Sequence, residues 1–111
     1  MKFIETPTFT RLVLELLTDD EYRALQCSLC ERPDQGKLIK GGGGIRKMRV
    51  ASQGKGKSGG VRVIYYWITA QAQIYMLLVY PKSKKDSLTT GELTVLYALV
   101  RKELGDGYET V

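Results

Sequence analysis

The chain has 111 residues, of which 43% are hydrophobic and 26% charged, so we expect one folded domain over residues 1–111. It contains no histidine, which excludes Ser-His-Asp triads, histidine general bases and most catalytic zinc sites. Its net charge is +5. No apolar segment is long enough to span a bilayer, and Met1–Glu5 lacks a signal-peptide pattern. We therefore expect a cytoplasmic protein with no membrane partner.

The first third of the chain predicts a short strand and two helices. Residues 2–5 alternate weakly between apolar and polar side chains, as a strand does. Pro7 is a favourable first residue for a helix, and apolar residues follow it at helical spacing. Thr18 and Glu21 form a capping box that begins a second helix, which we expect to end near Glu31.

The rest of the chain predicts three consecutive strands and a final helix. The strands are expected over residues 45–51, 61–68 and 73–80, after a glycine-rich loop over 34–44. A second capping box, Thr89 with Glu92, begins the last helix. Short connections between successive strands favour antiparallel pairing. The predicted fold is therefore α+β, a small antiparallel sheet with two N-terminal helices and one C-terminal helix in the order β-α-α-β-β-β-α.

Basic residues are concentrated in the middle of the chain. Between Gln35 and Lys85 there are eleven lysines and arginines and no acidic residue, whereas the rest of the chain holds six basic and all twelve acidic residues. Like charges gathered in this way repel one another, and a polyanion such as a nucleic acid would relieve the repulsion. The alternative is a solvated basic face without a partner.

Cys27 and Cys30 form a CxxC motif inside the second predicted helix. A zinc site would need two more cysteine or histidine ligands, which the chain lacks, and a redox pair is expected at the start of a helix that follows a strand. We therefore expect two small side chains at the helix surface or the edge of the core. Neither a metal site nor a cofactor is predicted.

Two glycine-rich motifs lie in the loop expected over residues 53–60. Residues 51–58 fit a relaxed P-loop pattern, and residues 54–59 fit G-x-G-x-x-G. Both motifs hold phosphate at the N-terminus of a following helix, but the next segment is predicted to be a strand. This argues against nucleotide binding and favours a hairpin loop whose lysines contact a nucleic acid backbone.

The predicted sheet can gather a set of cations and aromatic rings. Strand alternation places Lys47 and Arg49 on one surface, and the neighbouring strands and loops add Arg62, Lys82, Lys84 and Lys85. Cations bind phosphates and rings stack on unpaired bases, so single-stranded RNA fits better than a DNA groove. The usual role of any one tyrosine is a half-buried strand residue; the candidate rings are Tyr65, Tyr66, Tyr75 and Tyr80.

Such a site could cleave RNA without histidine, because RNA carries its own nucleophile, the 2′-hydroxyl. The protein must hold the backbone for in-line attack, stabilise the growing charge on phosphorus and move two protons. Arginine and lysine can stabilise that charge, and a lysine crowded by other cations can accept a proton near neutral pH. Cleavage of this kind would depend on another component to position the RNA.

The chain resembles the RelE/HigB-type toxins of bacterial type II toxin–antitoxin systems, in the RelE/ParE superfamily, and most closely the HigB branch. The resemblance covers nearly the whole chain and is strongest over residues 41–90. It is carried by the order of elements and by three stretches: IRKMRV over 45–50, GGVRVIYY over 59–66 and VYPKSKKDSL over 79–88.

The resemblance implies a ribosome-dependent mRNA endonuclease that stops translation by 2′-hydroxyl attack. It also implies a cognate antitoxin, HigA-like and expected to carry a helix-turn-helix domain. Matched by position, the family's strand cations are Lys47, Arg49 and Arg62, and its cation after the last strand falls among Lys82, Lys84 and Lys85. We expect catalytic roles for Lys47, Arg49, Arg62, Lys82 and Lys85. The expected contacts to RNA or ribosome are Lys55, Lys57, Tyr66, Tyr80 and Lys84.

Two parts of this assignment are open. The tyrosine that RelE toxins use near the last helix has no match, because Thr89 stands at about that place. Its role is vacant or passes to another residue such as Tyr66 or Tyr80, so the general acid and base are unassigned. Arg62 is expected to face solvent, so that its loss would spare the fold. The alternative is that Arg62 pairs with a backbone carbonyl or a carboxylate of the last helix and holds the end of the sheet together. Two other functions remain possible: a ParE-like inhibitor of DNA gyrase, and a non-catalytic RNA-binding module whose affinity would survive Arg62→Lys.

Overall fold

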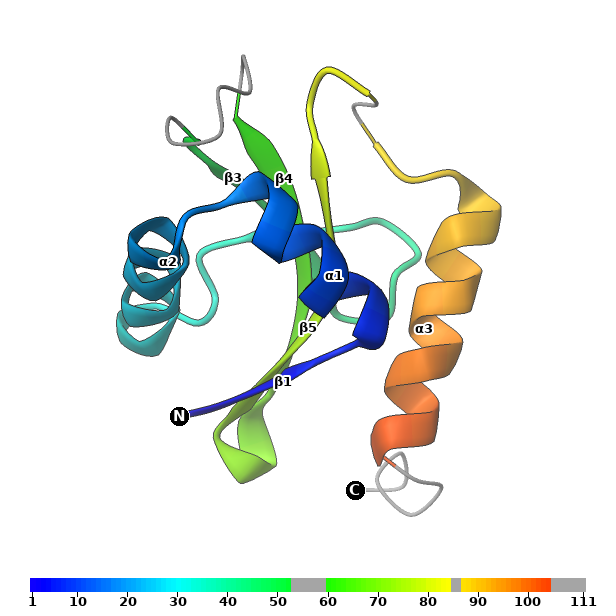
Figure 1. The fold of residues 1–111 in the computed structure, drawn as a ribbon. Coiled ribbons are helices and arrows are strands. Elements are labelled where there is room, and N and C mark those ends of the chain that lie inside the picture. The colour runs from blue at the N-terminus through cyan, green and yellow to red at the C-terminus, as the bar shows by residue number, and fades with distance from the viewer. Residues whose placement is uncertain (53–59, 85–86, 105–111) are drawn as a thin grey trace.

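The computed structural model describes residues 1–52, 60–84 and 87–104, which form a five-stranded sheet with helices on both faces (Figure 1). The elements in chain order are β1 (Lys2–Glu5), α1 (Pro7–Leu16), α2 (Asp19–Glu31), β2 (Lys37–Leu38), β3 (Ile45–Val50), β4 (Val61–Ile68), the 3-10 turn η1 (Thr69–Gln71), β5 (Gln73–Pro81) and α3 (Thr90–Leu104).

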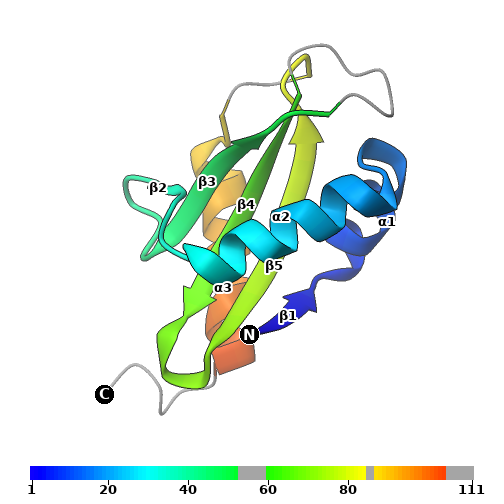
Figure 2. The ribbon, with the colours of Figure 1, turned by 90° about the vertical axis from the view of Figure 1, so that its left-hand side faces the viewer.

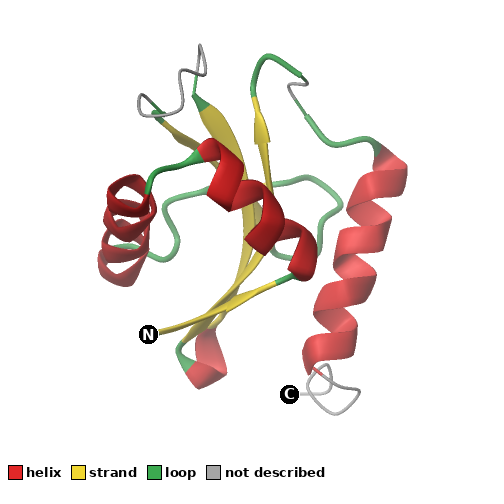
Figure 3. Cartoon of the chain, in the orientation of Figure 1, coloured by secondary structure: helices red, strands yellow, loops and turns green. Residues whose placement is uncertain are grey.

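The strand order across the sheet is β1-β5-β4-β3-β2. Figure 3 colours the strands yellow and the helices red. Neighbouring strands from β2 to β5 pair antiparallel, which agrees with the predicted α+β fold. Two features differ from the prediction. β1 pairs parallel with β5, and the loop expected over residues 34–44 contains the two-residue strand β2, which is too short to give a sequence pattern.

Side-chain caps begin all three helices, and both predicted capping boxes are present. The Phe9 amide donates to Thr6 Oγ1 at the start of α1. Thr18 and Glu21 exchange hydrogen bonds of 2.9 and 3.1 Å at the start of α2. Thr89 and Glu92 do the same at the start of α3, with the same two distances. These caps satisfy amides that the first helical turn leaves without partners.

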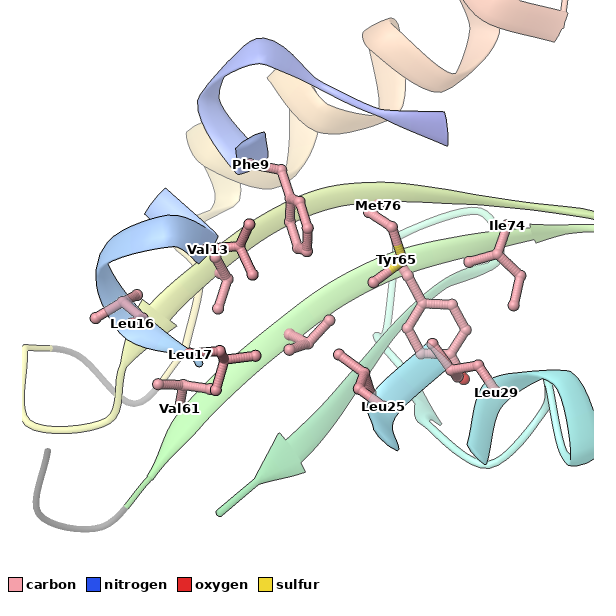
Figure 4. Close-up of a cluster of buried hydrophobic side chains, with 12 residues drawn as sticks. Phe9, Val13, Leu16, Leu17, Leu25, Leu29, Val61, Tyr65, Ile74 and Met76 are labelled. Atoms are coloured by element: carbon pink, nitrogen blue, oxygen red, sulfur yellow. The ribbon is translucent and has the colours of Figure 1, made fainter. Parts of the chain in front are cut away.

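The core has two layers, one on each face of the sheet (Figure 2). α1 and α2 cover one face with residues such as Phe9 and Leu29, as the close-up in Figure 4 shows. α3 covers part of the other face through Leu96 and Val100. β4 supplies both layers from alternate positions, so its sequence VRVIYYWI is almost continuously apolar. Arg62 is its one charged residue.

Three element boundaries move slightly from their predicted places. β3 ends at Val50, one residue before the expected end at residue 51. The turn expected at residues 70–72 is η1, closed by Ala72 with a left-handed φ of 52°, and β5 extends one residue further than expected, to Pro81. The glycine expected to stop α3, Gly105, lies outside the described residues. Within the described ranges, no helix is long and apolar enough to cross a membrane.

Candidate functional site

A hollow of about 760 Å³ lies at the end of the sheet where β3 and β5 finish and β4 begins, the upper end in Figure 1. Five of its seven lining residues are cations and none is acidic. We call this hollow the basic groove; it is lined by Gln35, Lys37, Lys47, Met48, Arg49, Arg62 and Lys82. Four of the five catalytic candidates from the sequence therefore share one site, and the fifth, Lys85, lies outside the described residues.

Strand register sets the cations in pairs. Arg49 on β3 lies directly opposite Arg62 on β4, and Lys47 lies opposite Lys37 on β2. Ile64 lies two residues beyond Arg62 on the same face of the sheet and packs into the core layer under α3. The basic groove is therefore on the α3 face of the sheet, next to the part that this helix covers. Like charges directly opposite one another destabilise a sheet. The arrangement is therefore unfavourable for the fold and suited to an anion.

Arg62 is the most unusual residue of the basic groove. Its side chain is 5% exposed, and its Nη1 atom is buried with no hydrogen-bond partner among the described residues. The expectation that Arg62 faces solvent is wrong, because β4 is a central strand and Arg62 is flanked by Arg49 on one side and Tyr80 on the other. A buried cation with an unsatisfied donor is costly unless a ligand supplies the acceptor.

Lys82 reaches the groove from the turn that follows β5. Its backbone amide donates to the carbonyl of Gly60 at 3.2 Å, which ties this turn to the start of β4, and the Lys84 amide donates to the carbonyl of Pro81 at 3.1 Å. The side chain of Lys84 is exposed but does not line the groove. Lys55 and Lys57, expected to bind RNA or the ribosome, lie outside the described residues.

The tyrosines do not line the basic groove. Tyr80 is 5% exposed, so the expectation that its ring stacks on a base is corrected: the ring belongs to the core layer under α3, and its strand partner on β4 is Arg62. Tyr66 is half-buried against the same layer, four residues along β4 from Arg62. Tyr65 and Tyr75 are also buried, and burial raises the pKa of both hydroxyls.

Sequence reasoning did not select Lys37 and Gln35 for this site. Both lie in the segment expected to be a loop, and only the pairing of β2 with β3 places them at the groove. The only signal in the sequence was a lysine next to a glycine, Gly36. The structure shows why the glycine matters, because its amide donates to the hydroxyl of Tyr65 at 2.9 Å. A contact between positions so far apart along the chain leaves no local pattern.

The CxxC motif forms no site in the described part of the chain. Cys27 and Cys30 are exposed free thiols on α2, as expected for small residues at a helix surface. No group of three potential metal ligands occurs within residues 1–52, 60–84 and 87–104.

Comparison with known proteins places this chain in a family. A family model described as the RelE toxin of the RelE/RelB toxin–antitoxin system matches residues 1–106. A chain of the intact E. coli RelBE toxin–antitoxin complex is similar in structure, with a TM-score of 0.57, 15% sequence identity, and coverage of 72% of this chain and 94% of that chain.

A second solved structure is a mutant of the E. coli toxin RelE in the free state, in which two arginines are replaced by alanine. It matches with a TM-score of 0.57 and 14% identity, over 89% of this chain and 95% of that one. The structural likeness supports the fold, while the family model spans nearly all of the sequence. The expected HigB branch stays a prediction, and the chain belongs to the RelE toxin family.

Proposed function

We propose that this RelE-family toxin is a ribosome-dependent mRNA endonuclease that acts in the cytoplasm, with the basic groove as its catalytic site. One observation carries the proposal: Arg62 lines the groove with Nη1 buried and unpartnered among the described residues, directly opposite a second arginine, Arg49. A phosphate group would accept a hydrogen bond from Arg62 Nη1, and its negative charge would offset the positive charges of both guanidinium groups. Two adjacent guanidinium groups can also bind the non-bridging oxygens bidentately.

The proposed reaction uses the nucleophile of the substrate. The 2′-oxygen attacks the adjacent phosphorus, the bond from phosphorus to the 5′-oxygen breaks, and the products are a 2′,3′-cyclic phosphate and a 5′-hydroxyl. The proton of the 2′-hydroxyl passes to a base, and the departing 5′-oxygen receives a proton from an acid. Arg49 and Arg62 stabilise the charge that grows on the phosphorane, Lys82 is the candidate for proton transfer, and Lys47 holds the strand beside the attacked phosphate.

The composition and exposure of the groove support the proposed dependence on the ribosome. Among its described lining residues there is no aromatic platform to hold a base, and Lys37, Arg49 and Lys82 are exposed to solvent. Free RNA would bind mainly through its charge and in many conformations, few of which align the 2′-oxygen for attack. The ribosome supplies a fixed mRNA strand, and Lys55, Lys57, Lys84 and Lys85 remain proposed contacts to mRNA or ribosome.

We also propose a cognate antitoxin, HigA-like and with a helix-turn-helix domain, that presents an acidic or amphipathic segment to this chain. Five cations without a carboxylate among the groove residues attract such a segment. The affinity of the complex should then fall as the salt concentration rises. Affinity that does not change with salt would leave apolar docking as the main attraction.

The test compares a reporter mRNA on programmed ribosomes with the same mRNA alone. The wild-type protein should cut only the ribosome-bound mRNA, Arg62→Ala should not cut it, and Lys40→Ala, which removes an exposed lysine that does not line the groove, should behave as wild type. Rapid cutting of naked mRNA would contradict the ribosome-dependent mechanism. Continued translation with a loss of DNA supercoiling would identify a gyrase inhibitor instead.

A further inference from the structure

We propose that Lys37 and Lys47 form a second phosphate subsite in the basic groove, next to the Arg49–Arg62 pair, so that the groove holds two successive phosphates of one RNA strand. The inference rests on the proposed function and extends it to a residue, Lys37, that sequence patterns do not select. Lys37 would bind the phosphate beside the one that is attacked and so position the strand.

The spacing of the two pairs supports this arrangement. Lys37 and Lys47 are directly opposite one another, and Arg49 and Arg62 are directly opposite one another. Lys47 and Arg49 are two residues apart on β3, which corresponds to about 6.6 Å along a strand. That distance is comparable to the spacing of successive phosphates in an extended RNA strand. All four side chains line the same hollow.

The segment that presents Lys37 is held rigidly from the opposite face of the sheet. Tyr65 Oη accepts the Gly36 amide at 2.9 Å and donates to the Pro33 carbonyl at 2.8 Å. Arg46 Nη1 donates to the carbonyls of Asp34 at 3.0 Å and Gly36 at 2.8 Å. Four hydrogen bonds from two side chains therefore fix the approach to β2, although β2 itself has only two residues.

Gly36 is needed for this attachment. A Cβ atom at this position would lie 2.8 Å from Tyr65 Cε1 and 3.1 Å from the Lys47 carbonyl oxygen, so a side chain would push the segment away from the sheet. The neighbouring Gln35 is also fixed, because its Nε2 donates to the Ser28 carbonyl and to Ser28 Oγ at 3.0 Å each. Lys37 thus extends from a preorganised backbone.

A purely structural role for Lys37 has no support in the described residues. Its side chain is exposed, and in residues 1–52, 60–84 and 87–104 it has no hydrogen-bond or ion-pair partner. A lysine placed opposite another lysine does not stabilise the strand pair. A bound anion between the two amines would turn this repulsion into attraction.

The experiment measures the affinity of the full chain for a 2′-O-methylated single-stranded RNA, which lacks the nucleophile, as a function of salt concentration. Each phosphate contact contributes about 0.7 to the slope of log affinity against log salt for a single strand. Lys37→Ala should reduce the slope by about 0.7, and Lys37→Arg should keep it, because the charge is retained. The matched control Lys40→Ala should also keep the slope.

Two results would overturn the subsite. The first is an equal slope for wild type and Lys37→Ala. The second is an equal loss of slope in Lys37→Ala and Lys40→Ala, which would indicate a diffuse field rather than a site. Thermal unfolding of Lys37→Ala should match wild type, since the side chain is exposed. Failure of the wild-type protein to cut ribosome-bound mRNA would contradict the proposed function and leave this binding measurement intact, so the two failures are distinguishable.

Discussion

Two arginines on neighbouring strands, Arg46 and Arg62, differ in whether their guanidinium groups find hydrogen-bond partners on the two faces of the sheet. Arg46, on the face covered by α1 and α2, is half-buried and donates to two backbone carbonyls. Arg62, on the other face, is more deeply buried, yet its Nη1 has no partner among the described residues, and its opposite neighbour is Arg49. Arg46 therefore stabilises the fold through its two hydrogen bonds, whereas Arg62 keeps a donor that a ligand can use.

Two buried hydroxyl groups near the ends of α1 also have hydrogen-bond partners, unlike Arg62 Nη1. The buried Ser52 hydroxyl donates to the Leu16 carbonyl at 2.8 Å, and the buried Thr6 hydroxyl donates to the Leu77 carbonyl at 2.9 Å. Native proteins satisfy nearly all buried polar groups, so a buried exception in a hollow indicates function more strongly than charge alone. Basic composition locates a region of the chain, and an unsatisfied donor locates a site within it.

The largest expected effect is on the cleavage rate of Arg62→Lys. The charge is kept, but the two-pronged contact with a phosphate is lost, and loss of such a transition-state contact costs about 2.7–4 kcal/mol, roughly a hundred- to a thousand-fold in rate. Cleavage of ribosome-bound mRNA under single-turnover conditions measures it. A rate within about threefold of wild type would show that any cation at this position is sufficient, as expected for a simple RNA-binding module.

The next effect concerns the polar network that holds Arg46 and β2. Tyr65→Phe removes one hydroxyl and leaves the buried Gly36 amide without its acceptor, which should destabilise the fold by about 1–3 kcal/mol. Chemical denaturation with a constant m-value measures this change. Equal stability of Tyr65→Phe and wild type would show that the network does not contribute to folding.

A matched pair of substitutions tests the comparison between the arginines directly. Arg62→Met should raise the free energy of unfolding by about 1–2 kcal/mol, because it removes a buried unsatisfied charge and fills the space with an apolar chain. Arg46→Met should lower it by about the same amount, because two carbonyls lose their donor. Melting temperatures should move in opposite directions by roughly 4 °C per kcal/mol. A decrease for both variants would mean that Arg62 also stabilises the fold.

The smallest effect separates the two capping boxes. Thr18→Ala should destabilise by about 1 kcal/mol, and Thr89→Ala by about half as much, because the bonds of the first box are partly buried and those of the second are exposed to water. Paired urea titrations of the two variants provide the comparison. An equal loss would indicate that exposure does not weaken the second box.

The sequence predicted most of the fold and the cations of the site, but not their surroundings. Capping boxes and the apolar pattern of β4 are local signals, and both were confirmed. Strand alternation also placed Lys47 and Arg49 on one surface. The burial of Arg62 and Tyr80 was missed because exposure depends on which strands and helices cover a position, which is a property of the whole sheet. Lys37 was missed because a two-residue strand is defined by its partner alone.

The parallel pairing of β1 with β5 has a consequence for the order in which the chain can fold. β2 to β5 are joined by neighbours in the sequence, but Lys2 is paired with Gln73, and the Thr6 hydroxyl donates to the Leu77 carbonyl across 71 positions. Contacts of such long range form slowly, because a large loop must close first. During synthesis, β1 has no strand to join until β5 has left the ribosome, and α1 lacks its contacts with β5 until then. A newly made toxin is therefore incomplete until most of its length has been translated.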